Sequence, residues 1–254
     1  MRRLRHLTGQ HRTASTNRLL GGLLAFNAGA VNAGGFLVVA MYTSHMTGFA
    51  SLLADNLVLG NMTLVLGATG ALLAFTVGAA VTAILVNGAR QHGLRSEYAL
   101  PLLLEALLLL IFGLMGATLN HQTPFAVPLT VLVLSFTMGL QNALVSKISS
   151  SQIRTTHMTG IVTDIGIELG KLFYWNHSAS PLESRVRANR IKLRLLATLL
   201  GAFVSGGVVG AAGFKYVGFI WVVPLALLLF ALCLPPLYSD LLRLLRRKAI
   251  RQGT

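Results

Sequence analysis

The feature that most constrains this chain is a series of long apolar runs separated by short polar stretches. Several runs exceed the length of about 18 residues that is typical of a membrane-spanning helix. Hydrophobic residues make up 54% of the 254 residues and charged residues only 11%, whereas soluble domains average roughly 25% charged residues. The sequence therefore predicts an integral membrane protein, and its length leaves no room for a soluble catalytic domain beside the spans.

The apolar pattern predicts six spans and two runs that are too short to cross. The predicted spans are residues 19–39, 63–88, 99–118, 125–146, 195–213 and 217–237. The short runs are residues 47–59 and a segment ending near Leu172, because a helix rises only about 1.5 Å per residue through a core about 30 Å thick. The tight link Tyr42-Thr43-Ser44 favours an early end of the first span, near Gly34-Gly35.

A repeated tetrapeptide shows that the chain is an internal duplication. His45-Met46-Thr47-Gly48 recurs as His157-Met158-Thr159-Gly160. The flanking segments match in the same order, as Phe26-x-x-Gly29-x-x-Asn32 and Phe136-x-x-Gly139-x-x-Asn142 before the motifs, and Phe75-x-x-Gly78 and Phe203-x-x-Gly206 after them. A fixed order of matching features indicates a repeat. We divide the chain into a basic segment (1–18), a first repeat (19–120), a second repeat (121–238) and a basic tail (239–254).

The positions of the basic residues predict the topology. Cytoplasmic loops of membrane proteins are enriched in Lys and Arg. If neither short run crosses, 20 of the 21 Lys and Arg residues lie on one side and only Lys215 lies on the other. Each repeat then has three spans and one re-entrant half-helix, so the two repeats are inverted, as in many secondary transporters. The predicted fold is an all-α membrane protein with six transmembrane helices, two re-entrant half-helices and both termini cytoplasmic.

The charge and the cysteine count exclude several other classes. The net charge of +14 comes from residues at the ends of the apolar runs, which indicates contact with anionic lipids at the cytoplasmic face rather than nucleic-acid binding. The single cysteine, Cys233, excludes an internal disulfide and is expected to be a buried thiol. No spacing typical of a metal site is present, so we expect neither a metal nor another cofactor.

The repeated motif supplies the first candidate site. Thr47 and Thr159 are placed to cap the short helices, and Gly48 and Gly160 allow close approach. The alternative is that Thr47 and Thr159 only cap their helices. Helix capping would not require the histidine of the motif or its second copy. We therefore expect two opposed helix N-termini to frame a site for an anionic or dipolar solute, with His45 and His157 as hydrogen-bond donors or proton carriers.

Further polar residues in apolar segments extend this candidate site. The additional pathway candidates are Asn32, Asn142, Arg154 and Thr156, and the proton-coupling candidates are Asp55, Glu105, Asp164 and Glu168. Ionisable residues in such segments are costly and usually functional. Asp164 and Glu168 are four residues apart on one helix face, which favours a shared proton. The alternatives are packing for the asparagines, a cytoplasmic loop charge for Arg154, and an ion pair between Glu168 and Lys171.

Four stretches of the chain resemble a known family. They are Ala28 to Phe36, His45 to Gly48, Met138 to Ala143, and Arg154 to Gly160. Together they are similar to the YoaK family of bacterial multi-spanning membrane proteins, over about residues 19–237. The resemblance implies a location in the bacterial cytoplasmic (inner) membrane, and it implies no particular substrate.

The sequence as a whole favours transport over catalysis. We expect a transporter of a small solute that works by alternating access, with proton coupling as an added hypothesis. A channel with two opposed half-helices fits the same pattern, and so does a non-transporting membrane sensor or assembly partner. An enzyme is not expected, because no spacing of nucleophile and base is visible. The expected partners are the bilayer, the solute and, as an open option, a second copy of the chain.

Overall fold

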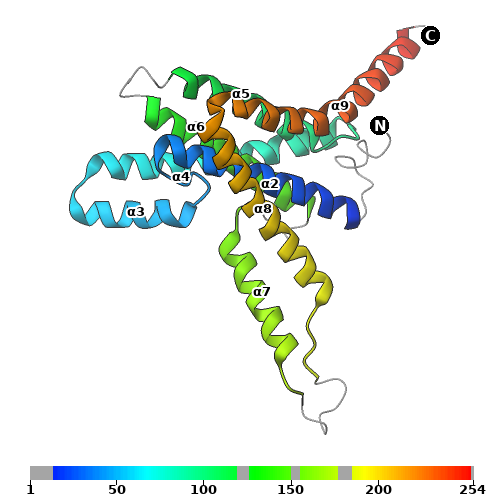
Figure 1. Ribbon diagram of the computed structural model, residues 1–254. Helices are drawn as coiled ribbons and strands as arrows, with labels where there is room; N and C mark the ends of the chain where they lie inside the picture. The colour runs from blue at the N-terminus through cyan, green and yellow to red at the C-terminus, as the bar shows by residue number, and fades with distance from the viewer. Residues whose placement is uncertain (1–13, 119–125, 150–154, 177–184, 253–254) are drawn as a thin grey trace.

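The computed structural model describes residues 14–118, 126–149, 155–176 and 185–252. Within these ranges the protein is all-helical (Figure 1). The helices are α2 (Ala14–Val39), α3 (Met46–Leu59), α4 (Met62–Gln91), α5 (Ala99–Thr118), α6 (Ala126–Ile148), α7 (Met158–Phe173), α8 (Arg190–Tyr216), the 3₁₀ turn η2 (Gly218–Trp221) and α9 (Val222–Gln252).

Six of these helices are long and apolar enough to cross a membrane, as the sequence predicts. They are α2, α4, α5, α6, α8 and the segment formed by η2 and α9. Three helix ends differ most from the predicted spans: α2 begins already at Ala14, α8 begins at Arg190, and α9 continues through the basic tail to Gln252. The first span ends at Val39 as predicted, so the early end near Gly34-Gly35 that the tight link favoured is wrong.

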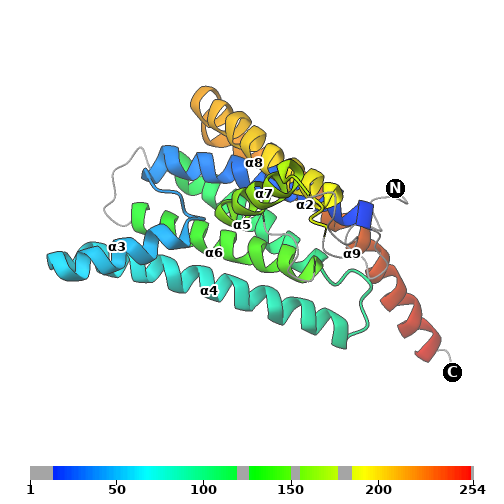
Figure 2. The same cartoon turned by 90° about the horizontal axis from the view of Figure 1, so that it is seen from below.

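The long helices form a bundle in which each repeat packs mainly against the other. The most extensive contacts join α2 to α8, α4 to α6, and α5 to α9. Figure 2 shows α2, α5 and α6 between α4 on one side and α8 on the other, and Figure 1 shows α5 beside α9. The main core lies between α2, α5, α6, α8 and α9, and it includes the fully buried Leu24, Phe112, Met138 and Leu229.

Glycines at two crossings bring helix backbones into direct contact. A Cβ at Gly29 of α2 would overlap the carbonyl oxygen of Phe203 on α8, and a Cβ at Gly206 of α8 would overlap that of Phe26. The crossing of α4 and α6 has the same reciprocal arrangement, in which Gly78 faces the carbonyl of Phe136 and Gly139 faces that of Phe75. The four Phe-x-x-Gly segments that match in the sequence therefore meet in pairs, and small residues at such positions allow membrane helices to approach closely.

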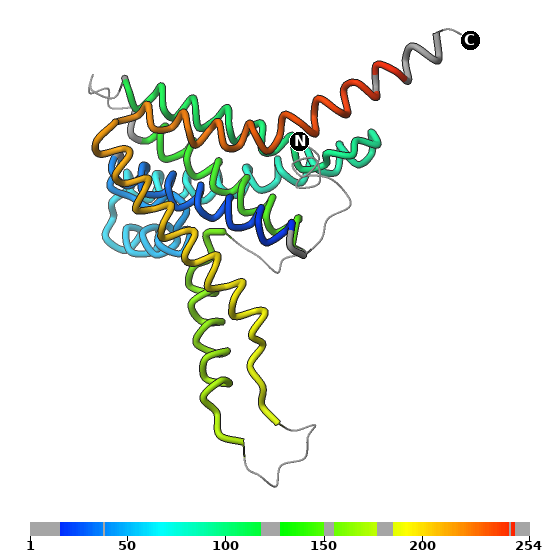
Figure 3. The backbone as a smooth tube through the Cα atoms, turned by 45° about the vertical axis from the view of Figure 1, so that its right-hand side comes forward, coloured from blue at the N-terminus to red at the C-terminus, as the bar shows by residue number. Residues whose placement is uncertain are grey.

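Two helical hairpins extend from this bundle (Figures 1 and 3). In the first, α3 turns back along α4 through Gly60, which has a φ of 72°, and Asn61, whose side chain accepts a hydrogen bond from the backbone N–H of Leu64. In the second, α7 packs mainly against α8. Both short helices therefore lie at the edge of the bundle, and each begins next to its centre.

A polar cluster holds the α4–α5 turn against α9 at one end of the bundle. Arg90 forms an ion pair with Glu97 at 2.6 Å. Asp240 of α9 accepts hydrogen bonds from the backbone N–H and the hydroxyl of Ser96, at 2.9 and 2.6 Å. These contacts fix the turn that leads into α5, the helix that carries Glu105.

Candidate functional site

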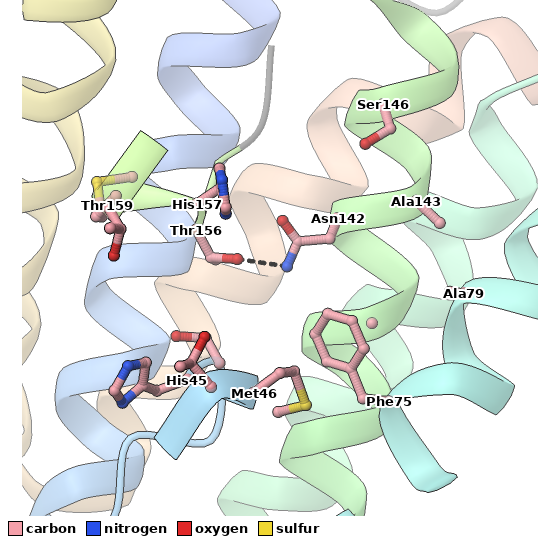
Figure 4. A pocket seen from close by; sticks show the side chains of 14 residues that line it. His45, Met46, Phe75, Ala79, Asn142, Ala143, Ser146, Thr156, His157 and Thr159 are labelled. Carbon is pink, nitrogen blue, oxygen red and sulfur yellow. Dashed lines mark hydrogen bonds between the residues drawn. The ribbon is translucent and has the colours of Figure 1, made fainter. Parts of the chain in front are cut away.

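Both copies of the repeated motif line a single cavity. It has a volume of about 520 Å³ and lies between the N-termini of α3 and α7 and the middle of α4 and α6 (Figure 4). The lining residues are Ser44, His45, Met46, Thr47, Phe75, Ala79, Gly139, Asn142, Ala143, Ser146, Thr156, His157, Met158 and Thr159. The fold thus brings together two segments that are far apart in the sequence.

The histidines of the motif, and not the threonines, occupy the N-cap positions. His45 precedes α3 and His157 precedes α7, and neither helix has a side-chain cap hydrogen bond. The prediction that Thr47 and Thr159 are N-caps is wrong. Both helices begin at the methionine that precedes the threonine, so the threonines are already helical. Both threonines lie instead in the first turn and line the cavity.

The glycine of each motif is explained by the histidine three residues before it. A Cβ at Gly48 would overlap the ring of His45, and a Cβ at Gly160 would overlap the ring of His157. Each imidazole therefore lies over the first turn of its own helix. This placement requires that the residue three positions after the histidine has no Cβ. The His-x-x-Gly spacing therefore allows an imidazole ring to lie against the N-terminus of each short helix.

The matching asparagines of α2 and α6 each form a hydrogen bond with the residue that directly precedes the motif histidine. The hydroxyl of Ser44 donates to Oδ1 of Asn32 at 2.8 Å. On the other side, Nδ2 of Asn142 donates to the hydroxyl oxygen of Thr156 (Figure 4). In both copies the hydroxyl residue directly precedes the histidine, so the asparagine of the span positions the histidine of the motif.

The cavity has a mixed lining of polar and apolar groups, and its described residues carry no fixed charge. Its lining, among the residues that the structure describes, contains no Asp, Glu, Lys or Arg. Hydroxyl, amide and imidazole groups face it, together with the first turns of two helices that lack side-chain caps. The N-terminus of a helix carries a partial positive charge of about half a unit. The site therefore offers hydrogen-bond donors and a positive potential to a small ligand.

The two carboxylates of α7 lie outside this cavity and have separate cationic partners. Glu168 accepts from Nζ of Lys171 at 2.9 Å and from the backbone N–H of Asn189 at 2.7 Å. Asp164 is paired with Nζ of Lys192 at 3.1 Å. The pairing of Glu168 with Lys171 is the alternative that the sequence left open. These contacts favour two ionised carboxylates over a proton shared between them.

The remaining sequence candidates lie apart from the cavity. Asp55 is exposed on α3, and Glu105 is fully buried on α5. Arg154 lies outside the described residues. In the part of the chain that the structure describes, no three His, Cys, Asp or Glu residues come close enough to hold a metal ion. Cys233 is a free, buried thiol, as expected.

Sequence reasoning missed three residues that shape the cavity. Phe75 belongs to the repeated Phe-x-x-Gly segment, yet its place in the wall depends on the crossing of α4 and α6. Ser146 lies one turn after Asn142, and Ser44 directly precedes the first motif. The shared position of Ser44 and Thr156 before the histidine was the one available signal, because both copies carry a hydroxyl residue there.

The Glu168 contacts predict that acid loosens the α7–α8 hairpin. The backbone N–H of Asn189, followed by Lys171, lowers the pKa of Glu168 below its ordinary value. A carboxylate with a lowered pKa stabilises the folded state at neutral pH, and this contribution is lost as the pH falls through the lowered value. We expect amide hydrogen exchange in α7, corrected for the intrinsic pH effect, to rise below about pH 4.

The control for this prediction is Glu168→Gln. This variant should exchange faster than the wild type at neutral pH and should show no additional acid-dependent step in α7. Exchange in α7 that rises equally with acid in both proteins would show that Glu168 does not hold the hairpin.

Comparisons with known proteins identify a family and a related membrane protein. A family described as Protein of unknown function (DUF1275) matches residues 20–234. The UPF0700 transmembrane protein YoaK of Bacillus subtilis (strain 168) is 28% identical over 218 residues, which cover 85% of this chain and 92% of that protein. No solved structure matches the chain. Because the family match extends from the first span into the last and includes both motifs, the chain belongs to this family of membrane proteins, the one described as Protein of unknown function (DUF1275).

Proposed function

We propose that this protein moves a small polar solute across the membrane by alternating access, and that the cavity between His45 and His157 is the solute site. One observation carries this proposal, namely that both copies of the repeated motif line the same cavity. A membrane module whose repeats serve only for packing would be expected to have a dry, glycine-packed centre. Here the glycine-packed crossing of α4 and α6 borders a cavity whose lining includes hydroxyl, amide and imidazole side chains.

The lining favours an anionic or dipolar solute. Two helix N-termini, two imidazoles and several hydroxyl groups can donate hydrogen bonds or attract negative charge. No carboxylate in the described lining offers the opposite charge to a cation. A cavity of about 520 Å³ falls within the range of small-molecule sites, roughly 300–1,000 Å³.

An inverted repeat would give this site its two accessible states. The reciprocal crossings support it, since α2 of the first repeat meets α8 of the second, while α4 of the first meets α6 of the second. In this proposal α3 and α7 are re-entrant half-helices that enter from opposite faces, with both termini in the cytoplasm and the protein in the inner membrane. Rocking of one repeat against the other at the glycine crossings would open the cavity to each side in turn.

Thiol labelling tests this proposal, because the chain contains one cysteine. Cys233→Ala would give a cysteine-free protein, into which Ser146→Cys places a thiol in the cavity wall. Alternating access predicts that a membrane-impermeant maleimide reacts with this thiol from either side of oriented vesicles. A solute identified by a thermal-shift screen of metabolites should slow the labelling from both sides.

The unmodified protein is the matched control, since Cys233 is fully buried in α9 and should resist the same reagent. Labelling from one side only would contradict alternating access and leave a sensor or assembly module. Equal and simultaneous access from both sides, with no protection by solute, would indicate a channel.

A further inference from the structure

A second polar site lies inside the helix bundle, away from the motif cavity. Asn27 of α2 and Glu105 of α5 are both fully buried. Nδ2 of Asn27 donates to Oε1 of Glu105 at 3.3 Å. The other oxygen of each side chain, Oδ1 of Asn27 and Oε2 of Glu105, has no hydrogen-bond partner within the described residues.

A single proton on Glu105 would satisfy both of these oxygens. A neutral carboxylic acid has one O–H donor, and a side-chain amide has both a donor and an acceptor. Once the amide N–H is bound to Oε1, a proton on Oε2 can be donated to Oδ1 of Asn27, which closes a two-point acid–amide pair. An ionised Glu105 would leave both oxygens as buried acceptors without a donor, and such unpaired buried groups are costly.

The surroundings offer no positive charge that would keep Glu105 ionised. No Lys, Arg or His of the described chain pairs with it. On α9 the titratable side chain that interacts with Glu105 is the buried thiol of Cys233, which donates to the carbonyl oxygen of Phe230. On α4, α6 and α9, the other long helices that pack on α5, the charged side chains lie near or beyond the ends of the apolar spans, among them Arg90, Lys147 and Asp240.

We propose that Asn27 and Glu105 form a proton-binding site, and that this proton is the ion coupled to solute movement. The coupling step rests on the transport function proposed above. Helix α2 connects the proton site to the cavity. It carries Asn27, which donates to Glu105, and Asn32, which accepts a hydrogen bond from Ser44 before the first motif. A displacement of α2 that opens the cavity would separate Asn27 from Glu105, admit water to the carboxyl group and release the proton.

Infrared spectroscopy of the full-length protein in lipid nanodiscs tests proton binding without any knowledge of the solute. At neutral pH the wild type should show the carbonyl-stretch band of a protonated carboxylic acid. Glu105→Gln should remove this band, and it should fold normally because an amide pair can replace the acid–amide pair. Glu168→Gln is the matched control, since it removes a buried carboxylate that has cationic partners and should leave the band unchanged.

Two results would overturn the proton site. One is a wild-type spectrum without the protonated band at neutral pH, and the other is a band that persists in Glu105→Gln. If the band appeared only after removal of Na⁺, the two free oxygens of the pair would belong to a cation site instead.

Flux in proteoliposomes then tests the coupling separately from transport itself. The proposal expects Glu105→Gln to exchange solute across the membrane but to lose accumulation driven by a pH gradient. Accumulation that stays at the wild-type level would overturn the coupling. An absence of flux in the wild type would reject the transport function and leave the infrared result standing.

Discussion

Replacing both His45 and His157 by alanine is expected to abolish measurable solute binding. These side chains are the only titratable groups among the described cavity-lining residues, and each lies at the start of a short helix. A hydrogen bond from such a group contributes about 1.5–3 kcal/mol when the ligand is charged, so each single variant should weaken binding roughly 10- to 100-fold. Calorimetric titration of the purified variants with the solute from the thermal-shift screen would measure the loss.

His92→Ala is the matched control for this experiment. His92 is exposed at the end of α4, where its ring contacts the carbonyl of Gly88, and it does not line the cavity. Its removal should leave the affinity unchanged. Wild-type affinity in the double variant would show that the solute binds elsewhere.

The number and length of the spans could be predicted because they depend on one local property. A helix that crosses the bilayer needs an uninterrupted apolar run, and the sequence displays each run directly. The helix ends could not be predicted from the same property. Basic segments such as Arg190 to Arg194 and Arg243 to Arg251 lie outside the apolar runs, yet Arg, Lys and Leu are good helix formers and extend α8 and α9.

The candidate site was predictable where the duplication marked it and not where it depends on tertiary contacts. The repeat identifies His45 and His157, and the equivalence of Asn32 and Asn142 could also be read from the sequence. Thr156 was among the predicted pathway residues, but the pairing of Asn32 with Ser44 and of Asn142 with Thr156 could not be predicted, because each hydrogen bond crosses the turn between a span and a short helix.

For the carboxylates, too, local contacts could be anticipated from the sequence and tertiary contacts could not. The pair of Glu168 and Lys171 is local on one helix and was an open alternative, whereas Lys192 reaches Asp164 only because α7 folds back on α8. The contact of Asn27 with Glu105 joins α2 to α5, which are separated by two other helices in the chain.

Alanine at Gly29 or Gly139, which represent the two glycine crossings, is expected to destabilise the fold clearly more than a methyl group added to a glycine of the long helices that has open space around it. At both positions the new Cβ would meet a backbone carbonyl oxygen, Phe203 for Gly29 and Phe75 for Gly139. A backbone cannot turn aside as a flexible side chain can, so the helices must separate. Overpacking in a close-packed interior costs about 1–3 kcal/mol, and the midpoint of unfolding in a mixed-detergent titration should fall accordingly.

Gly67→Ala on α4 separates this effect from the general preference of helices for alanine. A Cβ at Gly67 would have no atom within 4 Å, so this variant should be neutral or more stable by roughly 0.5–1 kcal/mol. If Gly139→Ala behaves like Gly67→Ala, then α4 and α6 do not cross at these glycines.

Double variants distinguish the two crossings from a general loss of packing. Gly29 and Gly206 belong to one crossing, so once the first Cβ has separated α2 from α8, the second should add little. Gly29 and Gly139 belong to different crossings, and their effects should be nearly additive. Additive effects within the first pair would contradict the reciprocal contact. Since that contact joins one repeat to the other, they would also remove the main structural support for two repeats that rock about a shared cavity.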